Sequence, residues 1–169
     1  MVQEGGLLVD SHAPVTARDI MTTPVISVVA EALIEDVAQL LGKHRISAVP
    51  VVDDEQHVVG LVSEYDLLAT PGVTAAQVMT SSVISVTTDT AISDIRKLLV
   101  NQWIVRVPVL ENGRLVGIVS RADIVALLAT EWMCGACGEP VRGEHPPKAC
   151  PKCGADSERF VLHEQPTGP

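Results

Sequence analysis

The chain has 169 residues, of which 47% are hydrophobic and 2% aromatic, so it can bury a sizeable core built from aliphatic side chains. This composition excludes an intrinsically disordered chain, and no apolar run reaches the roughly 18 residues that a membrane-spanning helix needs. The net charge of −9 makes nucleic acid an unfavourable partner, because an acidic surface repels phosphate backbones.

We expect residues 1–14 to be a flexible N-terminus. This segment has no basic residue ahead of an apolar stretch, so it does not read as a signal peptide, and we expect a cytoplasmic location. An internal repeat follows, in which residues 16–52 match residues 74–110 in order. One residue is then missing from the second copy at an expected hairpin tip, after which the match resumes. The repeat predicts two units, over 15–72 and 73–131.

Each copy contains the same predicted elements. The first has a helical turn opening at Thr16, an extended segment over 25–28, an amphipathic helix from Leu33 to His44, a strand over 48–52, a return strand ending at Ser63, and a closing helix. The second repeats this order from Thr74 to a return strand ending at Ser120. We therefore predict an α/β (α+β) fold of two β-α-β-β-α units. Pseudo-two-fold packing buries their sheets and leaves clefts at the seams, to which both copies contribute.

Three duplicated motifs carry a family resemblance. They are DIMT at 19–22 with QVMT at 77–80, VPV at 49–51 with VPV at 107–109, and GLVSEYD at 60–66 with GIVSRAD at 117–123. Together they resemble the tandem cystathionine β-synthase (CBS) domain pair over residues 15 to 130. The resemblance implies homodimers formed through the CBS pairs, and adenosyl ligands bound by the serine and aspartate of the third motif. Those residues are Ser63, Asp66, Ser120 and Asp123.

The serine and aspartate of this motif also have a purely structural interpretation. Serine at the N-cap and an acid three residues later form a capping box that satisfies free backbone N–H groups. The same geometry suits a nucleotide, because a helix N-terminus attracts phosphate and a carboxylate accepts ribose hydroxyls. Both interpretations stay open from the sequence.

The two clefts are expected to differ in charge. The second copy has Arg121 and Arg106 where the first has Glu64 and Ala48. Arginine binds phosphate through its planar fork, so we predict that Arg121 and Arg106 supply one cleft for a phosphorylated ligand. The other cleft, with Glu64, is expected to be empty or to prefer an uncharged or cationic adenosyl group. Candidate contacts to the base are Ile26, Ala48, Ile84 and Ile104, and Pro108 is a further candidate for ligand binding.

The C-terminal segment 132–163 contains all four cysteines, in the motifs CGAC at 134–137 and CPKC at 150–153. Two such turns present four thiolates to one metal ion, so Cys134, Cys137, Cys150 and Cys153 are the predicted ligands. Two disulfides or a redox dithiol are the alternatives, which a cytosolic chain disfavours. Trp132, Gly143 and Phe160 complete a resemblance to the rubredoxin-like domain of rubrerythrins. That domain binds iron, whereas zinc is the default in a short four-thiolate ribbon, and residues 164–169 are expected to fray.

The sequence shows no catalytic constellation, Walker loop or Ser–His–Asp pattern, so we expect no enzymatic activity. We predict a regulatory protein in which the CBS pair binds an adenosine ligand (AMP, ADP, ATP or S-adenosylmethionine) and the ribbon binds Zn²⁺. Two alternatives remain, namely an iron-loaded electron-transfer protein and an interaction module without a nucleotide. The protein partner is not specified by the sequence.

Overall fold

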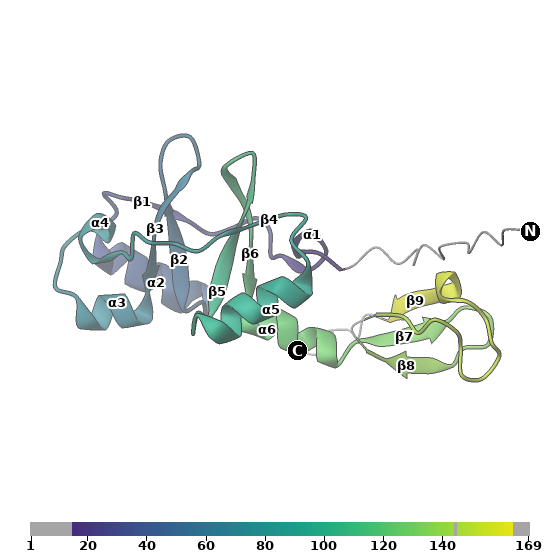
Figure 1. Cartoon of the computed structure of the whole chain (residues 1–169). Coiled ribbons are helices and arrows are strands. Elements are labelled where there is room, and N and C mark those ends of the chain that lie inside the picture. The colour runs from purple at the N-terminus through teal and green to yellow at the C-terminus, as the bar shows by residue number, and fades with distance from the viewer. Residues whose placement is uncertain (1–14, 144, 164–169) are drawn as a thin grey trace, which may run out of the picture.

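The computed structural model describes residues 15–143 and 145–163, so the predicted flexible segments at 1–14 and 164–169 lie outside the described residues. The first repeat contains α1 (Ala17–Ile20), β1 (Val28–Val29), α2 (Ile34–His44), β2 (Ala48–Val52), β3 (Val58–Ser63) and α3 (Glu64–Ala69). The second contains α4 (Ala75–Val78), β4 (Val86–Thr87), α5 (Ile92–Asn101), β5 (Arg106–Glu111), β6 (Arg114–Ser120) and α6 (Arg121–Leu128). The two units stand side by side in Figure 1.

Each repeat forms a three-stranded sheet, in the orders β1-β2-β3 and β4-β5-β6. The first strand runs parallel to the second, and the second and third form an antiparallel hairpin. The predicted β-α-β-β-α units are therefore confirmed. In the segments expected to be extended, over 25–28 and 83–86, strand pairing begins only at Val28–Val29 and Val86–Thr87.

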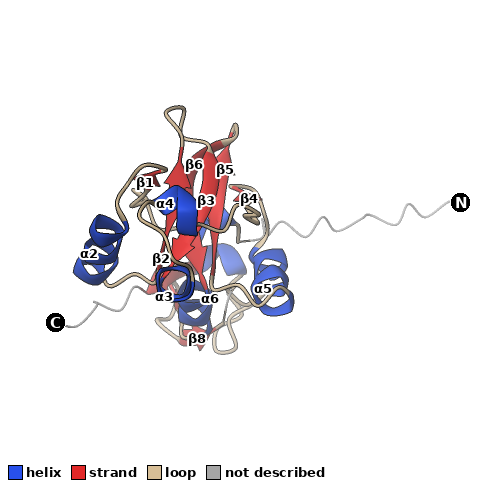
Figure 2. Ribbon diagram, turned by 90° about the vertical axis from the view of Figure 1, so that its left-hand side faces the viewer, coloured by secondary structure: helices blue, strands red, loops and turns tan. Residues whose placement is uncertain are grey.

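The core is aliphatic, as the composition predicts. All five residues of β2 are buried, and Val49 and Val51 pack in one cluster with Val37 and Leu41 of α2. In Figure 2 the strands occupy the middle of the molecule, with α2 and α5 on opposite sides. Each helix buries one stripe, formed by Val37 and Leu41 in α2 and by Ile92, Ile95 and Leu99 in α5.

The short opening helices are exchanged between the repeats. The first, α1, begins with a hydrogen bond from the amide of Ala17 to the carbonyl of Thr90, and its buried Ala17 belongs to the core of the second repeat. The second, α4, makes the corresponding bond from Ala75 to Ala32 and packs in the core of the first repeat. Each structural half of the repeated pair is therefore not one continuous repeat of sequence.

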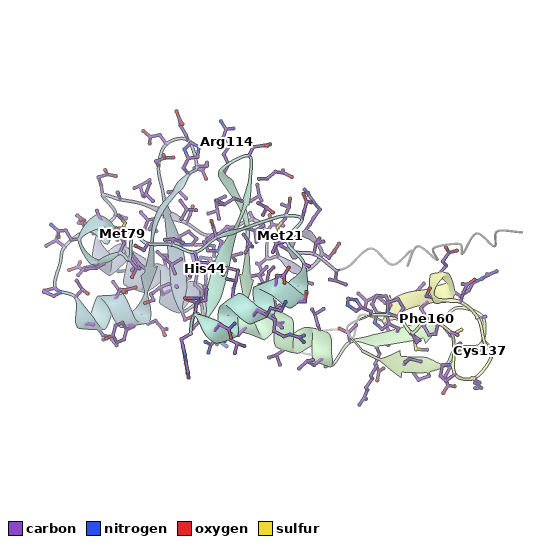
Figure 3. All side chains as sticks on the ribbon, in the orientation of Figure 1. Met21, His44, Met79, Arg114, Cys137 and Phe160 are labelled. Carbon is purple, nitrogen blue, oxygen red and sulfur yellow. The ribbon has the colours of Figure 1, made fainter. Side chains whose placement is uncertain are left out.

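A methionine and a glycine mark each exchanged contact. Thr80, just after Met79, pairs with Leu61 on β3, and Thr22, just after Met21, pairs with Ile118 on β6. Figure 3 labels the two methionines, which lie in different halves of the repeated pair. A Cβ atom added at Gly60 or Gly117 would collide with the side chain of Met79 or Met21, respectively. Glycine lets each methionine lie directly on the opposite sheet.

The C-terminal unit is a small antiparallel sheet of β7 (Glu131–Cys134), β8 (Pro140–Arg142) and β9 (Phe160–His163), in the order β8-β7-β9, with a 3₁₀ turn η1 (Ser157–Arg159). Its core consists of Phe160 and two of the cysteines, and the indole N–H of Trp132 donates to the carbonyl of Gly143 at 2.9 Å. The sheet begins shortly after α6 ends, and the amide of Gly143 donates to the carbonyl of Thr130. Among the described residues, no helix is long and apolar enough to cross a bilayer.

Candidate functional site

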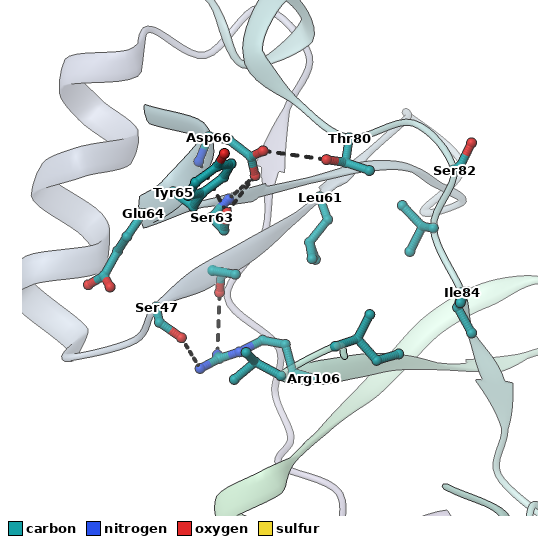
Figure 4. Close-up of a pocket in the computed structure, with 14 residues that line it drawn as sticks. Ser47, Leu61, Ser63, Glu64, Tyr65, Asp66, Thr80, Ser82, Ile84 and Arg106 are labelled. Carbon is teal, nitrogen blue, oxygen red and sulfur yellow. Dashed lines mark hydrogen bonds between the residues drawn. The ribbon is translucent and has the colours of Figure 1, made fainter. Parts of the chain in front are cut away.

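A cleft of about 480 Å³ lies at the seam of the two sheets, within the size range of small-molecule sites. Both repeats contribute to it, as expected from the sequence. Its lining residues are Ser47, Ala48, Leu61, Ser63, Glu64, Tyr65, Asp66, Thr80, Ser82, Val83, Ile84, Ile104, Val105 and Arg106. Figure 4 shows Asp66 and Thr80 on one side of this cleft and Arg106 on the other.

The start of α3 places Ser63 and Asp66 in the cleft. One carboxylate oxygen of Asp66, Oδ2, accepts from the backbone N–H of Ser63 at 2.8 Å and from its hydroxyl at 2.6 Å. The amide of Asp66 donates back to the Ser63 hydroxyl at 3.2 Å, which completes a capping box. The other oxygen, Oδ1, accepts from the Thr80 hydroxyl at 3.4 Å. The motif therefore forms the predicted cap and still presents a carboxylate oxygen and a hydroxyl beside the cleft.

Arg106 crosses the seam from the second repeat. Its guanidinium donates to the Ser47 hydroxyl at 2.7 Å and to the Ala48 carbonyl at 3.4 Å. Its Nε is buried without a hydrogen-bond partner. Burial lowers the pKa of Arg106, and the carboxylates of Asp123 and Glu64 oppose this effect. The cleft therefore contains a partly desolvated cation that hydrogen-bonds only neutral oxygens.

The second motif forms the same cap at the start of α6. Ser120 donates to Asp123 Oδ2 from its amide and from its hydroxyl, both at 2.7 Å. Arg121 donates from Nε to the Ile104 carbonyl at 2.8 Å and from Nη2 to the Leu99 carbonyl at 3.1 Å. These bonds hold Arg121 against the backbone of its own repeat.

Of the two arginines predicted to supply one cleft, Arg106 lines the described cleft and Arg121 does not. Arg106 shares this lining with Glu64, which was expected in the other cleft. Of the predicted contacts, Ala48, Ile84 and Ile104 line this cleft together with Ser63, Asp66 and Arg106. The predicted residues that do not line it are Ser120, Arg121, Asp123, Ile26 and Pro108.

Two of these residues have other positions in the fold. Pro108 is fully buried within β5, and Ile26 packs against the core of the first repeat. Sequence reasoning did not single out Thr80, Ser82 and Tyr65, which do line the cleft. The signal that could have identified Thr80 as a site residue is the duplicated Met-Thr pair, which recurs at the end of each opening helix.

The four cysteines form a second candidate site, at one end of the small sheet. Their sulfur atoms all lie within 4.8 Å of one another, with Cys134 to Cys153 at 3.7 Å and Cys137 to Cys150 at 3.6 Å. A tetrahedral ion with arms of about 2.3 Å gives edges of roughly 3.8 Å between sulfurs, whereas a disulfide needs about 2.05 Å. The cysteines are free thiols, and their spacing fits one ion.

The tight turns that carry the cysteines place backbone N–H groups near the sulfur atoms, and the pKa values of Cys150 and Cys137 shift in opposite directions. Gly138 and Gly154 both adopt a φ of 73°, and their amides donate to the carbonyls of Cys134 and Cys150. Backbone N–H groups of Cys153 and Lys152 point at the Cys150 sulfur and lower its pKa to about 7, against the effect of burial. The backbone amide of Glu139 lowers the pKa of Cys137, but burial and the neighbouring sulfurs raise it to about 12. Thiolates this close together repel each other, so a bound cation would stabilise the set, and the donor set suits zinc and iron alike.

Comparison with known proteins identifies two kinds of domain in this chain. The family model of the CBS domain matches residues 17–71 and 75–130, and the rubredoxin-like domain of rubrerythrin matches residues 132–161. An uncharacterized 17.7 kDa protein of Acidianus ambivalens is 30% identical over 149 residues, which cover 83% of this chain and 90% of that protein.

Solved structures similar to this chain include CBS pairs with bound ligands. The CBS pair of protein MJ0100, in complex with 5′-methylthioadenosine and S-adenosyl-L-methionine, has a TM-score of 0.65 and 30% identity, covering 69% of this chain and 97% of that one. CBSX2 of Arabidopsis thaliana, in complex with AMP, has a TM-score of 0.63 and 32% identity, covering 66% and 93%. This chain belongs to the CBS domain family, as a tandem CBS pair followed by a rubredoxin-like four-cysteine domain.

Proposed function

We propose that this protein is a regulatory module whose CBS pair binds an adenosine ligand in the cleft of Ser63, Asp66 and Arg106. The observation that carries the proposal is the composition of this cleft. A carboxylate and a hydroxyl lie on one side, a cation lies on the other, and the apolar side chains of Ile84 and Ile104 also line it. The carboxylate and hydroxyl suit a ribose, the cation suits a phosphate or carboxylate, and the apolar side chains suit a base. The similarity to CBS pairs solved with adenosyl compounds supports the same ligand class.

Ligand binding would act on the arrangement of the two repeats. The cleft draws Ser63 and Asp66 from the first repeat, and Thr80, Ile84 and Arg106 from the second. A ligand that contacts both groups favours the relative placement in which all contacts are made, and so shifts the population of states. In this proposal the protein regulates a partner and catalyses no reaction.

We also propose that the rubredoxin-like domain holds Zn²⁺ through its four cysteines as a structural site. The domain is short and its core contains only Phe160 and cysteines as buried residues, so an ion would supply much of its folding free energy. Thiolate ligands are kept reduced in the cytoplasm, which supports the expected location.

A homodimer formed through the CBS pair is the proposed assembly. The helices that close the two repeats leave large apolar side chains in solvent, with Tyr65 76% and Leu68 88% exposed on α3, and Val125 and Leu128 each 61% exposed on α6. The two helices follow equivalent motifs, so their apolar faces form a repeated surface that a second copy can cover.

A ligand panel tests the proposed function. Calorimetric titration and thermal unfolding of the metal-replete protein would be carried out with AMP, ADP, ATP and S-adenosylmethionine. A ligand at 100 times its Kd adds about 2.7 kcal/mol to the unfolding free energy, a shift of roughly 5–10 °C for a chain of this size. Asp66→Ala should abolish binding in the described cleft, whereas Asp156→Ala in the rubredoxin-like domain should leave it unchanged. Absence of binding by every compound would leave an interaction module without a nucleotide ligand.

Electron transfer is the second candidate function, and the match of residues 132–161 to a rubredoxin-like domain favours it. An iron ion bound by the four cysteines would exchange one electron with a partner. Metal analysis and the visible spectrum of the purified protein separate the two functions. Colour that disappears reversibly on reduction supports iron, and a colourless protein with one zinc per chain contradicts electron transfer.

A further inference from the structure

The charged side chains of the cleft do not match a polyphosphate. Its lining contains two carboxylates, Glu64 and Asp66, and one guanidinium, Arg106, while every other lining residue is neutral. We infer that this cleft selects adenosyl ligands with a single phosphate or carboxylate over di- and triphosphates, with Arg106 binding that group and Glu64 limiting the charge accepted. This inference rests on the proposed adenosine binding and adds the charge class of the ligand.

Arg106 has unused capacity for one anion. Its guanidinium hydrogen-bonds the Ser47 hydroxyl and the Ala48 carbonyl, neither of which carries a charge. Its Nε is buried and has no partner, which is unusual because buried N–H groups are nearly always satisfied. An acidic group bound there would compensate the charge and could accept from the unused donors.

Nothing else in the lining supplies a second cation. The position after the motif serine is Glu64 in this repeat, where the second repeat has Arg121. Arg121 is held by the carbonyls of Ile104 and Leu99 and does not line the cleft. A triphosphate would therefore place three or four negative charges near one guanidinium and two carboxylates, and each further phosphate adds repulsion without a new partner.

Glu64 is the residue through which this selectivity can be changed. It is the first residue of α3, it is exposed, and it is not part of the capping box, which uses Ser63 and Asp66. Replacing its carboxylate by an amide removes one negative charge and leaves the cap intact. Arg106 is also open to substitution, because alanine occupies the equivalent position of the first repeat, at Ala48.

The experiment measures Kd for adenosine, AMP and magnesium-free ATP by calorimetry at low ionic strength. In the unmodified protein, AMP should bind more tightly than adenosine, and ATP about tenfold more weakly than AMP. Glu64→Gln should tighten ATP binding about threefold to tenfold and AMP binding less, and added salt should reduce this difference. The matched control is Glu158→Gln, which changes an exposed acid of the rubredoxin-like domain. It should change neither the Kd for AMP nor the Kd for ATP.

Arg106→Gln tests the anion contact separately. AMP should bind about tenfold more weakly, adenosine should be unaffected, and Arg106→Lys should recover part of the AMP affinity. Circular dichroism verifies that each variant is folded. ATP binding as tight as AMP, or an equal effect of Glu64→Gln on both, would overturn the charge selection while leaving adenosine binding in place. If none of the three compounds binds, the proposed function and this inference both fall.

Discussion

At the scale of single residues, the motif Ser-x-x-Asp caps a helix in both repeats. In only one repeat does it also line the described cleft. Ser63 with Asp66, and Ser120 with Asp123, form the same capping box with hydrogen bonds of similar length. Only Ser63 and Asp66 line the described cleft. The second pair is therefore an internal control for the structural role of the first.

The paired caps give a prediction about serine. Ser63→Ala and Ser120→Ala should each lower the unfolding free energy by about 1 kcal/mol, because each removes the acceptor for a backbone amide at a helix start. Only Ser63→Ala should also weaken adenosyl ligand binding in this cleft. Urea unfolding measures the first effect and calorimetry the second. Equal losses of affinity in both variants would show that the described cleft is not where the ligand binds.

A second prediction concerns the exchanged methionine. Gly60→Ala should lower the unfolding free energy by about 1–3 kcal/mol, because the added methyl group collides with Met79 and the well-packed seam must shift. In the double variant Gly60→Ala with Met79→Ala, the shortened side chain at position 79 removes the collision. The double variant should therefore lose less unfolding free energy than the sum of the two single variants. Chemical denaturation of the four proteins gives this coupling.

A control variant for this experiment exists in α2. A Cβ atom at Gly42 meets nothing within 4 Å, and the residue is helical. Gly42→Ala should therefore raise the unfolding free energy by about 0.5–1 kcal/mol through helix propensity. A loss of stability at Gly42 similar to that at Gly60 would contradict the collision as the cause.

At the scale of elements, the chain joins units that hold together in different ways. The CBS pair has two aliphatic clusters, formed by sheets and helices from both repeats. The rubredoxin-like domain buries Phe160 and two cysteines and has little other core. The first unit gains its stability from apolar burial, whereas we propose that the second depends on an ion held by its four sulfurs.

This difference predicts separate unfolding when the metal is removed. A strong chelator should unfold the rubredoxin-like domain and leave the secondary structure of the CBS pair intact. Trp132 reports the change, because its indole donates to Gly143 within that domain and should become exposed. Cys150→Ala should reproduce the effect and remove the bound metal from the purified protein. A single cooperative loss of both units on chelation would show that the CBS pair also depends on the metal.

At the scale of the whole molecule, the exposed apolar faces of α3 and α6 determine the expected assembly. Leu68→Glu should shift the protein from dimer to monomer, because it places a charge within the surface that we propose to be covered by the second copy. Leu162→Glu, at a residue 49% exposed on β9, should leave the dimer unchanged. Analytical ultracentrifugation of both variants measures the masses, and a dimer that survives Leu68→Glu would contradict this interface.

Local patterns in the sequence predict the repeated elements, the Ser-x-x-Asp caps and the cysteine cluster. These features depend on neighbours in the chain: hydrophobic periodicity sets helices and strands, serine and aspartate three residues apart form a cap, and paired cysteines converge through their own turns. The strands at 28–29 and 86–87 were less predictable, because their pairing depends on β2 and β5.

Only the tertiary structure decided how the repeats combine. Arg106 was expected beside Arg121 because both belong to the second copy, where the first copy has Ala48 and Glu64. Its side chain instead extends across the seam to Ser47 and joins the motif of the other repeat. The repeated sequence likewise does not predict the exchange of α1 and α4, since identical motifs could pack on their own sheet or on the neighbouring one. Contacts between distant segments depend on which faces bury the most apolar surface together, and no local pattern contains that information.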